Sequence, residues 1–271
     1  MNHSEYIKGN KEAWEESFDK STIGFGERDA EKLKTQSFPF LDDALIQEIK
    51  KYDFSGKKVL QLCCNNGREI MSITKNVNAA CGVGIDIAEN IVAQARANAI
   101  KAGVDCEFFA GNVLDVREDL IDQFDAVFVL VGAICWFEDL TEFFKIASLY
   151  LKKEGKLFVY EIHPASDIIP LEGDEGYDPE NQLKIGWSYF KKEPFKDELG
   201  MSYVVGAKFE SKVFTSFPHT MSDVINGIAH NDLRILDCKE FDYDVGGNFP
   251  HLDNKGFPLT LMIVAEKNVI M

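Results

Sequence analysis

The chain has 271 residues, enough to bury the core of one α/β domain and to carry a sizeable insertion. Hydrophobic residues make up 45% and charged residues 27%, as in soluble globular proteins. The 45 acidic residues outnumber the 29 basic ones and give a formal net charge of −16, which disfavours binding to nucleic acid or to anionic lipid.

Neither a membrane-spanning stretch nor the apolar core of a signal peptide is visible in the sequence, so we expect a cytoplasmic protein. Five of the six cysteines lie in or beside predicted strands, and Cys238 stands apart. There is no CxxC pair and no Cys/His cluster with zinc spacing. We therefore expect reduced thiols and predict no metal site.

Residues 1–52 are predicted to form a helical cap around a polar loop at 20–38. Trp14, Phe18 and Phe25 offer apolar anchors, and Leu41–Ile49 has apolar residues at helical spacing. From residue 58 the pattern changes to strands that alternate with helices.

Residues 53–163 are predicted to form the core of the fold. The run Phe124–Val131 is continuously apolar, which is typical of a strand buried on both faces. The alternation predicts a parallel sheet that helices cover on both faces. The predicted strands are Val59–Cys63, Ala80–Asp86, Cys106–Ala110, Phe124–Val131 and Lys156–Ile162, and the predicted helices are Arg68–Thr74, Glu89–Ala102 and Glu138–Leu151.

Turn-forming residues interrupt this rhythm after residue 163. Two strand-like runs follow, Lys184–Phe190 and Tyr203–Phe217, so residues 164–218 are predicted to be a β-rich insertion over the ligand-bearing edge. Residues 219–271 are predicted to complete the sheet with one helix, Ser222–Asn231, and two strands, Arg234–Phe241 and Leu259–Ala265.

The segment from Val59 to Asp86 has the layout of a nucleoside-binding βαβ unit: strand, tight turn, helix, and a second strand that ends on an acid. The turn at Cys63–Gly67 brings backbone close to a ligand at a helix N-terminus. Asp86 lies where it could accept hydrogen bonds from ribose hydroxyls. Its alternative role is to cap the helix that follows.

Over about residues 57–163 the chain resembles the class I S-adenosylmethionine-dependent methyltransferases, especially their small-molecule branch. In that family the first strand ends in an acid and a loop with three glycines. Gln61 stands here at the acid position, Cys63 and Asn65 replace two glycines, and Gly67 keeps the third. The resemblance implies a doubly wound, mostly parallel, seven-stranded Rossmann-like sheet with an antiparallel last strand.

The resemblance also implies a cofactor site. Asparagine tolerates the left-handed backbone region well, so Asn65 or Asn66 is expected to hold the turn. Gln61 can accept a hydrogen bond from the cofactor's ammonium group but carries no charge. The residues implied to bind the cofactor are Tyr6, Trp14, Gln61, Cys63, Cys64, Asn65, Gly67, Asp86, Ile87, Asn112, Val113, Leu130 and Val131.

Three of these segments have specific expected roles. Asn112 would face the adenine amino group and Val113 the ring, although Asn112 also suits an ordinary turn. The backbone after Leu130 would lie beside the transferred methyl. Tyr6 and Trp14 stand where N-terminal helices of relatives cover the cofactor, with a buried core position as the alternative for Trp14.

Methyl transfer needs a general base only when the acceptor must lose a proton. Glu161 and His163, at the end of the strand Lys156–Ile162, are candidates, and His219 is a third. For a single histidine a structural role is the more common one. No nucleophile motif is present, and this reaction needs none.

The resemblance implies an enzyme that moves a methyl group from S-adenosylmethionine to an O, N or C atom of a small molecule, leaving S-adenosylhomocysteine. An NAD-dependent oxidoreductase is a first alternative, weakened because a pyrophosphate needs a barer glycine loop than Cys63–Gly67. A non-catalytic S-adenosylmethionine-binding protein is a second, suggested by the altered glycine loop.

Overall fold

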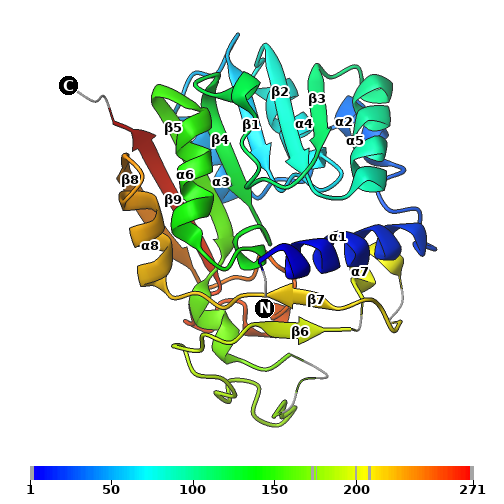
Figure 1. Cartoon of the computed structure of the whole chain (residues 1–271), viewed down its shortest axis with the longest axis vertical. Helices are drawn as coiled ribbons and strands as arrows, with labels where there is room; N and C mark the ends of the chain where they lie inside the picture. Colours follow the sequence, from blue (N-terminus) through cyan, green and yellow to red (C-terminus); the bar gives the residue numbers. More distant parts are fainter. Residues whose placement is uncertain (1–2, 172–173, 175, 199, 207–208, 269–271) are drawn as a thin grey trace.

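A computed structural model of the chain describes residues 3–171, 174, 176–198, 200–206 and 209–268. At its centre lies a seven-stranded sheet of order β3-β2-β1-β4-β5-β9-β8 (Figure 1). Only β9 runs antiparallel to its neighbours β5 and β8. The predicted fold class is therefore confirmed. The strands are β1 (Lys58–Leu62), β2 (Cys81–Asp86), β3 (Cys106–Ala110), β4 (Phe124–Leu130), β5 (Leu151–Ile162), β8 (Leu233–Phe241) and β9 (Thr260–Lys267).

Helices cover both faces of this sheet, as the sequence predicts. On β5, Leu157 and Val159 pack in the apolar cluster shared with α6 and α8, whereas Phe158 and Tyr160 pack in the cluster shared with α2 to α5. Alternate side chains of a strand point to opposite faces, so one strand contributes to both clusters. The helices are α2 (Asp29–Thr35), α3 (Asp43–Ile49), α4 (Arg68–Asn76), α5 (Glu89–Ala102), α6 (Leu140–Tyr150) and α8 (Met221–Ala229).

Local sequence sets where these helices begin and end. The Asp139 side chain caps α6 by accepting the backbone N–H of Thr141 at 2.7 Å. Thr220 and Asp223 form a capping box at the start of α8. Gly103, in the left-handed conformation with φ +66°, ends α5.

The insertion differs from its prediction. The run Lys184–Phe190 forms no strand, and Ile185 and Phe190 are 69% and 73% exposed, so neither a partner strand nor a core holds it extended. In the run Tyr203–Phe217 only β7 (Phe214–Ser216) is a strand; its start belongs to α7 (Ser202–Val205), and residues 207 and 208 lie outside the described residues. A hairpin is present, since β7 pairs antiparallel with β6 (Phe195–Asp197), but it is short.

The N-terminal part contains more helix than expected, because α2 lies within the predicted loop at 20–38. Its Leu33 is fully buried in the cluster shared with α4 and α5, and this tertiary contact stabilises a helix of only seven residues. Four 3-10 turns complete the described structure: η1 (Glu118–Leu120), η2 (Ile134–Trp136), η3 (Pro164–Ile168) and η4 (Pro250–Leu252).

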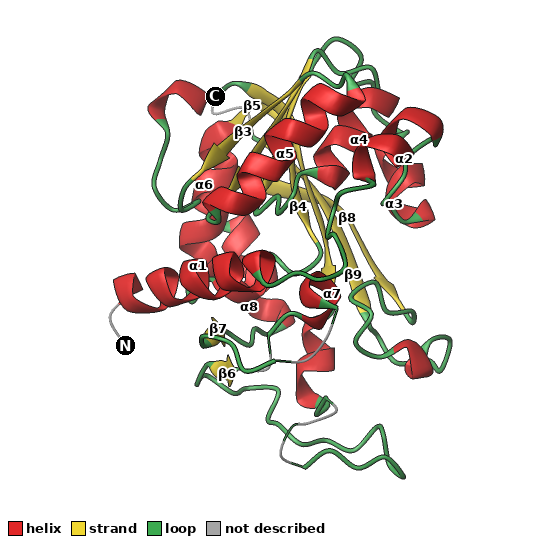
Figure 2. Ribbon diagram, turned by 90° about the vertical axis from the view of Figure 1, so that its right-hand side faces the viewer, coloured by secondary structure: helices red, strands yellow, loops and turns green. Residues whose placement is uncertain are grey.

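Helix α1 (His3–Asp19) lies along the carboxyl edge of the parallel strands, with the β6–β7 hairpin on its other side (Figures 1 and 2). It contacts α5, α7 and β7. No helix among the described residues is long and apolar enough to cross a membrane. Because helix α1 lies along the carboxyl edge of the sheet, it covers the edge at which the predicted site residues lie.

Candidate functional site

The predicted site residues meet where the chain changes direction across the sheet. From β1 the chain continues to β2 on one side, and β4 pairs with β1 on the other. Ligands of open α/β sheets bind in the crevice that such a reversal leaves at the carboxyl ends of the strands. The loops after β1, β2, β4 and β5 all reach this edge.

The loop after β1 takes an unusual backbone path. Cys63, Asn65 and Gly67 all have left-handed conformations, with φ of 53°, 50° and 72°. Asn65 therefore holds the turn, as one of the two predicted asparagines. Cys63 also adopts the left-handed conformation, which costs free energy for a residue that has a Cβ atom. The loop thus keeps the shape that glycines allow although two of the expected glycines are absent.

Gly67 is required for packing as well as for its backbone angle. A Cβ at this position would lie 2.2 Å from the Phe108 ring. Likewise, a Cβ at Gly84 would lie 2.6 Å from the Cys64 sulfur. Close packing of α4 against the sheet therefore depends on these glycines. Cys64 is fully buried beneath the loop, and its contact with the cofactor stays a prediction.

Asp86 joins the loop after β1 to the start of α5. Its Oδ2 accepts the backbone N–H of Asn65 at 2.7 Å, and its Oδ1 accepts that of Ala88 at 3.1 Å. Burial raises the pKa of this carboxyl, while the hydrogen bonds from the backbone oppose the rise. Each oxygen retains acceptor capacity, because a carboxylate oxygen can accept two hydrogen bonds. The capping alternative and ligand binding are thus compatible.

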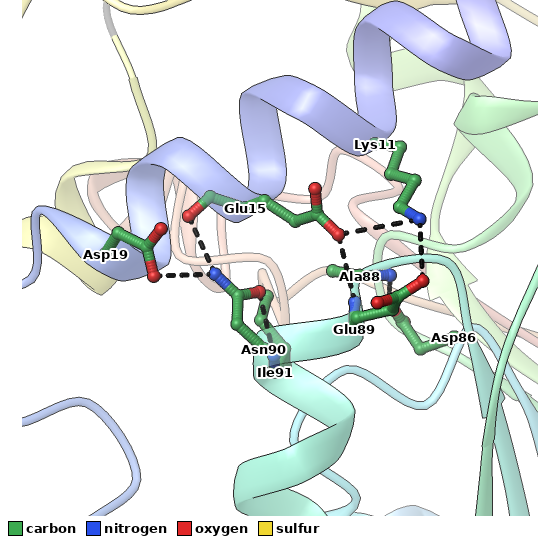
Figure 3. Close-up of polar contacts among 8 residues, drawn as sticks. All are labelled: Lys11, Glu15, Asp19, Asp86, Ala88, Glu89, Asn90 and Ile91. Atoms are coloured by element: carbon green, nitrogen blue, oxygen red, sulfur yellow. Dashed lines mark hydrogen bonds and ion pairs between the residues drawn. The ribbon is translucent and has the colours of Figure 1, made fainter.

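Polar contacts join helix α1 to the first turn of α5, next to Asp86 (Figure 3). Lys11 Nζ lies 3.1 Å from Glu89 Oε1, and Glu15 accepts the Glu89 backbone N–H at 3.2 Å. The Asn90 amide donates to the Glu15 carbonyl at 2.9 Å and to the Asp19 carboxylate at 2.8 Å. These contacts hold α1 beside Asp86.

Gln61 carries an unsatisfied acceptor at this edge. Its side chain is 3% exposed, and its Oε1 has no hydrogen-bond partner among the described residues. A buried acceptor without a partner costs free energy, so such a group calls for a donor from elsewhere. The ammonium group of a methionine moiety is a donor of the kind the resemblance implies, and Gln61 fits it.

The other predicted cofactor residues differ in accessibility. Asn112 Oδ1 accepts the backbone N–H of Leu114 at 3.1 Å, which makes it part of its own turn. Val113 and Leu130 are buried, Ile87 is half-buried, and Val131 is 40% exposed. Contacts from these residues to adenine and to the methionine part stay predictions.

Tyr6 and Trp14 attach α1 to the segments that cover the edge. Tyr6 packs edge-on against Phe217 with ring centroids 4.9 Å apart, and burial raises its pKa to about 12. Trp14 packs against Trp136 of η2 at 5.8 Å and Phe214 of β7 at 5.5 Å. Trp14 therefore belongs to an aromatic cluster that joins α1, η2 and β7.

Glu161 is a carboxylate surrounded by backbone donors. Oε1 accepts the N–H groups of Ala133 and Ile134 at 2.6 and 3.0 Å, and Oε2 accepts those of Gly132 and Ile162 at 2.8 and 3.0 Å. Burial raises its pKa, and the four hydrogen bonds oppose the rise. These bonds fill the oxygens, so Glu161 is placed to hold the loop after β4 rather than to take a proton from a substrate.

His163 is likewise engaged at both ring nitrogens. Nδ1 accepts the backbone N–H of Ala165 at 3.0 Å and so caps η3. Nε2 therefore carries the proton and donates to Glu240 Oε1 at 2.8 Å. Burial lowers the pKa of His163, and Glu240 opposes this. The histidine has the structural role that the sequence leaves open for it.

His219 is buried, and its Nε2 has no partner among the described residues. Burial lowers its pKa, while the backbone carbonyls of Ile134 and Phe137 and the charge of Asp223 oppose this. The imidazole thus lies between the loop after β4 and the start of α8.

Four residues at or after the carboxyl ends of β1, β2, β4 and β5 are partly exposed: Cys63, Asp86, Cys135 and Asp167. We use the name central cleft for the crevice expected at the carboxyl edge of the sheet, between the loops after β1, β2, β4 and β5. At Gly132, in the loop after β4, an added Cβ would meet no atom within 4 Å. Sequence reasoning missed Asp167, which burial and the nearby charge of Glu161 shift to a pKa of about 7. Its only signal in the sequence is its place five residues after β5.

Comparisons with known proteins agree with this geometry. Residues 59–155 match a family model described as a methyltransferase domain. A curated relative, the ubiquinone biosynthesis O-methyltransferase of Pseudomonas syringae pv. tomato, is 28% identical over 153 residues, which is 56% of this chain and 64% of that protein. The match thus spans a little under two thirds of that relative.

Solved structures of low sequence identity share the fold. An S-adenosylmethionine-dependent methyltransferase from Mesorhizobium loti has a TM-score of 0.59 at 17% identity, with 81% of this chain and 96% of that one covered. Geranyl diphosphate C-methyltransferase from Streptomyces coelicolor A3(2) has a TM-score of 0.62 at 10% identity, with 98% and 99% covered. The alignment with the second structure therefore extends over the insertion and the N-terminal helix as well as the core.

Proposed function

We propose that this chain, whose residues 59–155 match a methyltransferase domain, is a class I, S-adenosylmethionine-dependent methyltransferase that methylates a small molecule enclosed in the central cleft. The cofactor supplies an electrophilic methyl group on a sulfonium with a good leaving group. The protein then contributes mainly alignment and the exclusion of water.

The main observation in support of this proposal is the side chain of Gln61. A buried amide oxygen without a partner, at the end of the strand where the family has an acid, is an acceptor for the cofactor's ammonium group. Asp86, on the neighbouring strand, offers free acceptor capacity to the two ribose hydroxyls. Glu161 keeps the loop Gly132–Ile134 in place beside the methyl group.

A small acceptor is favoured by what surrounds the cleft. Helix α1 and the β6–β7 hairpin cover the carboxyl edge of the sheet, so we propose that residues 1–52 and 164–218 form the cofactor cap and the acceptor cover. The net charge of −16 opposes an acidic polymer as substrate. The relatives named above act, by their names, on a ubiquinone precursor and on geranyl diphosphate. The acceptor atom and the cytoplasmic location stay predictions.

Calorimetric titration of the purified chain with S-adenosylmethionine, S-adenosylhomocysteine and NAD tests the proposal. We expect both adenosyl ligands to bind and NAD not to bind. Binding of NAD alone would favour the oxidoreductase, and binding of none of the three would overturn the cofactor site. Release of S-adenosylhomocysteine in a screen of small hydroxyl, amine and carbon acceptors separates an enzyme from a non-catalytic binder.

Asp86→Ala tests the ribose contact within the same titration. We expect at least a tenfold loss of affinity, because hydrogen bonds to a charged group are worth roughly 1.5–3 kcal/mol. The control is Asp232→Asn, at an exposed aspartate beside the start of β8, where asparagine tolerates the left-handed backbone. Unchanged affinity together with a lower melting temperature would make Asp86 a structural residue only.

A further inference from the structure

We infer that Asp29 is a positioning residue for the cofactor site: through its hydrogen bond to Asn66 it holds the loop Cys63–Gly67 in the shape that admits the adenosyl ligand. This inference rests on the proposed function and adds a residue that acts through the loop. Asp29 lies outside both the family match at residues 59–155 and the set of site residues predicted from the sequence.

The loop Cys63–Gly67 needs support from outside itself. Cys63 and Asn65 have left-handed backbone angles, φ 53° and 50°, which cost free energy for residues that have a Cβ atom. Such conformations persist only where the surrounding structure fixes them. Asp86 Oδ2 accepts the Asn65 N–H at 2.7 Å, and Asn65 Oδ1 accepts the Asn66 N–H at 2.8 Å. These bonds involve Asn65 and the backbone of Asn66, and the Asn66 side chain makes a separate connection to α2.

This connection is a buried hydrogen bond. Asn66 Nδ2 donates to Asp29 Oδ2 at 2.9 Å, and Asn66 Oδ1 accepts the backbone N–H of Arg68, at the start of α4, at 3.4 Å. Asn66 and Asp29 are 1% and 6% exposed, so water competes little for the bond between them. A hydrogen bond to a carboxylate is stronger than one between neutral groups. Asn66 therefore joins the loop after β1 both to α4 and to the first residue of α2.

The turn at residues 25–29, which leads into α2, is itself held by amide side chains of α5. Gln94 Nε2 donates to the Phe25 carbonyl at 2.7 Å, and Asn98 Nδ2 donates to the Gly26 carbonyl at 3.0 Å. Helix α5 also follows β2, whose last residue is the predicted ribose ligand. The turn therefore links the two segments that are expected to bind the cofactor.

Gly26 lets this turn approach both of its neighbours. It has φ +73°, and a Cβ there would lie 2.5 Å from Gln94 Oε1 and 2.6 Å from Asn66 Nδ2. The Gly26 carbonyl also accepts the backbone N–H of Asp29 at 3.2 Å. The position of Gly26 therefore sets where the Asp29 carboxylate meets the Asn66 amide.

Loss of the bond between Asp29 and Asn66 is expected to weaken cofactor binding through the free protein. A ligand that binds one conformation of a loop has an apparent dissociation constant that grows as the populated fraction of that conformation falls. Without Asp29, the left-handed residues Cys63 and Asn65 have one constraint fewer, and other loop conformations become populated. The effect on affinity is thus separate from any effect on global stability.

Calorimetric titration of the whole chain with S-adenosylhomocysteine, at a temperature where every variant is folded, tests the inference. We expect about a tenfold loss of affinity in Asp29→Ala and in Asn66→Ala, because loss of a hydrogen bond to a charged group shifts an equilibrium by about this factor. Asp29→Asn keeps an acceptor for the Asn66 amide, and we expect its affinity to stay within about threefold of wild type. Wild-type affinity in Asp29→Ala would overturn the inference, and so would equally weak binding by Asp29→Asn and Asp29→Ala.

The double variant Asp29→Ala/Asn66→Ala shows whether the two side chains act as a pair. We expect it to bind S-adenosylhomocysteine as weakly as Asn66→Ala alone, because no bond is left for the second substitution to remove. Losses of affinity that multiply would overturn the inference, since each side chain would then act independently.

The matched control is Glu48→Ala, at another buried carboxylate. Glu48 is 2% exposed and accepts hydrogen bonds from Lys51 and Lys239, neither of which is a predicted cofactor residue. We expect Glu48→Ala to lower the melting temperature and to leave the affinity for S-adenosylhomocysteine unchanged. A loss of affinity as large as that of Asp29→Ala would show that general destabilisation weakens binding, and would overturn the inference.

Hydrogen exchange in the wild-type chain keeps the inference falsifiable if Asp29→Ala does not fold. Because the turn and the loop are joined, we expect saturation with S-adenosylhomocysteine to slow exchange in peptides that cover residues 24–30 as well as residues 62–68. Slower exchange at residues 62–68 with no change at residues 24–30 would overturn the inference.

The outcomes also separate this inference from the proposed function. If neither S-adenosylmethionine nor S-adenosylhomocysteine binds to the wild-type chain, both are overturned. Binding that neither Asp29→Ala nor Asn66→Ala weakens would overturn the role of Asp29 alone and leave the methyltransferase proposal intact.

Discussion

Replacing Glu161 by glutamine tests the anchor of the loop after β4. The carboxylate accepts four backbone N–H groups, two at each oxygen. Glutamine keeps one oxygen but turns the other into an NH₂ group, which faces two N–H donors and can accept from neither. Each buried donor left without a partner costs about 1–3 kcal/mol, so the loss of stability amounts to about 2–6 kcal/mol. Because the substitution also removes a buried charge, part of this loss is offset, and we expect a net loss of stability of about 2–4 kcal/mol.

Urea denaturation of the ligand-free protein measures the effect of Glu161→Gln directly. The matched control is Glu154→Gln, on the same strand but exposed, where we expect a change within about 0.5 kcal/mol. We also expect weaker binding of S-adenosylmethionine, because the loop Gly132–Ile134 loses its attachment to β5. A stability change as small as that of the control would refute the reasoning that the four bonds hold this loop.

Three shorter predictions concern the loop after β1 and the pH dependence of stability. Gly67→Ala puts a Cβ 2.2 Å from the Phe108 ring at φ 72°, so we expect a loss of about 2–4 kcal/mol by denaturation, and a neutral result would contradict the packing role of this glycine. Cys63→Gly removes the backbone strain of a left-handed residue that has a Cβ atom. After allowance for the greater freedom of glycine in the unfolded chain, we expect stability to rise by about 0.5–1 kcal/mol. A fall in stability would show that contacts of the cysteine side chain contribute more than this strain costs. Asp167 has a raised pKa in the folded protein, so the folded state holds a proton that the unfolded state has lost, and its contribution to stability should increase as the pH falls from 8 toward 5, whereas the lowered pKa values of His163 and His219 act in the opposite direction. Melting temperatures across this range should rise less for Asp167→Asn than for wild type, and parallel curves would contradict the shift.

The sequence predicted the helices and strands of the core well and those of the insertion poorly. The strand Cys106–Ala110 and the helix Glu89–Ala102 have the predicted bounds, because apolar periodicity and glycine stops act over a few residues. In the run Lys184–Phe190 the same apolar character led to a wrong prediction, since no neighbouring strand pairs with it. Strand propensity needs a partner, and pairing is a property of the fold.

The sequence by itself determined the order of the sheet's βα units and a turn held by Asn65 or Asn66, because hydrophobic periodicity and left-handed tolerance belong to local stretches of chain. Only the tertiary structure decided which polar groups are free to react. Glu161 receives donors from residues 132–134, and His163 pairs with Glu240, 77 positions away. The pKa of Asp167 is raised by burial and by the charge of Glu161, while the backbone of His219 opposes the rise. Burial and charge depend on which distant segments meet in space, and the order of residues does not display that.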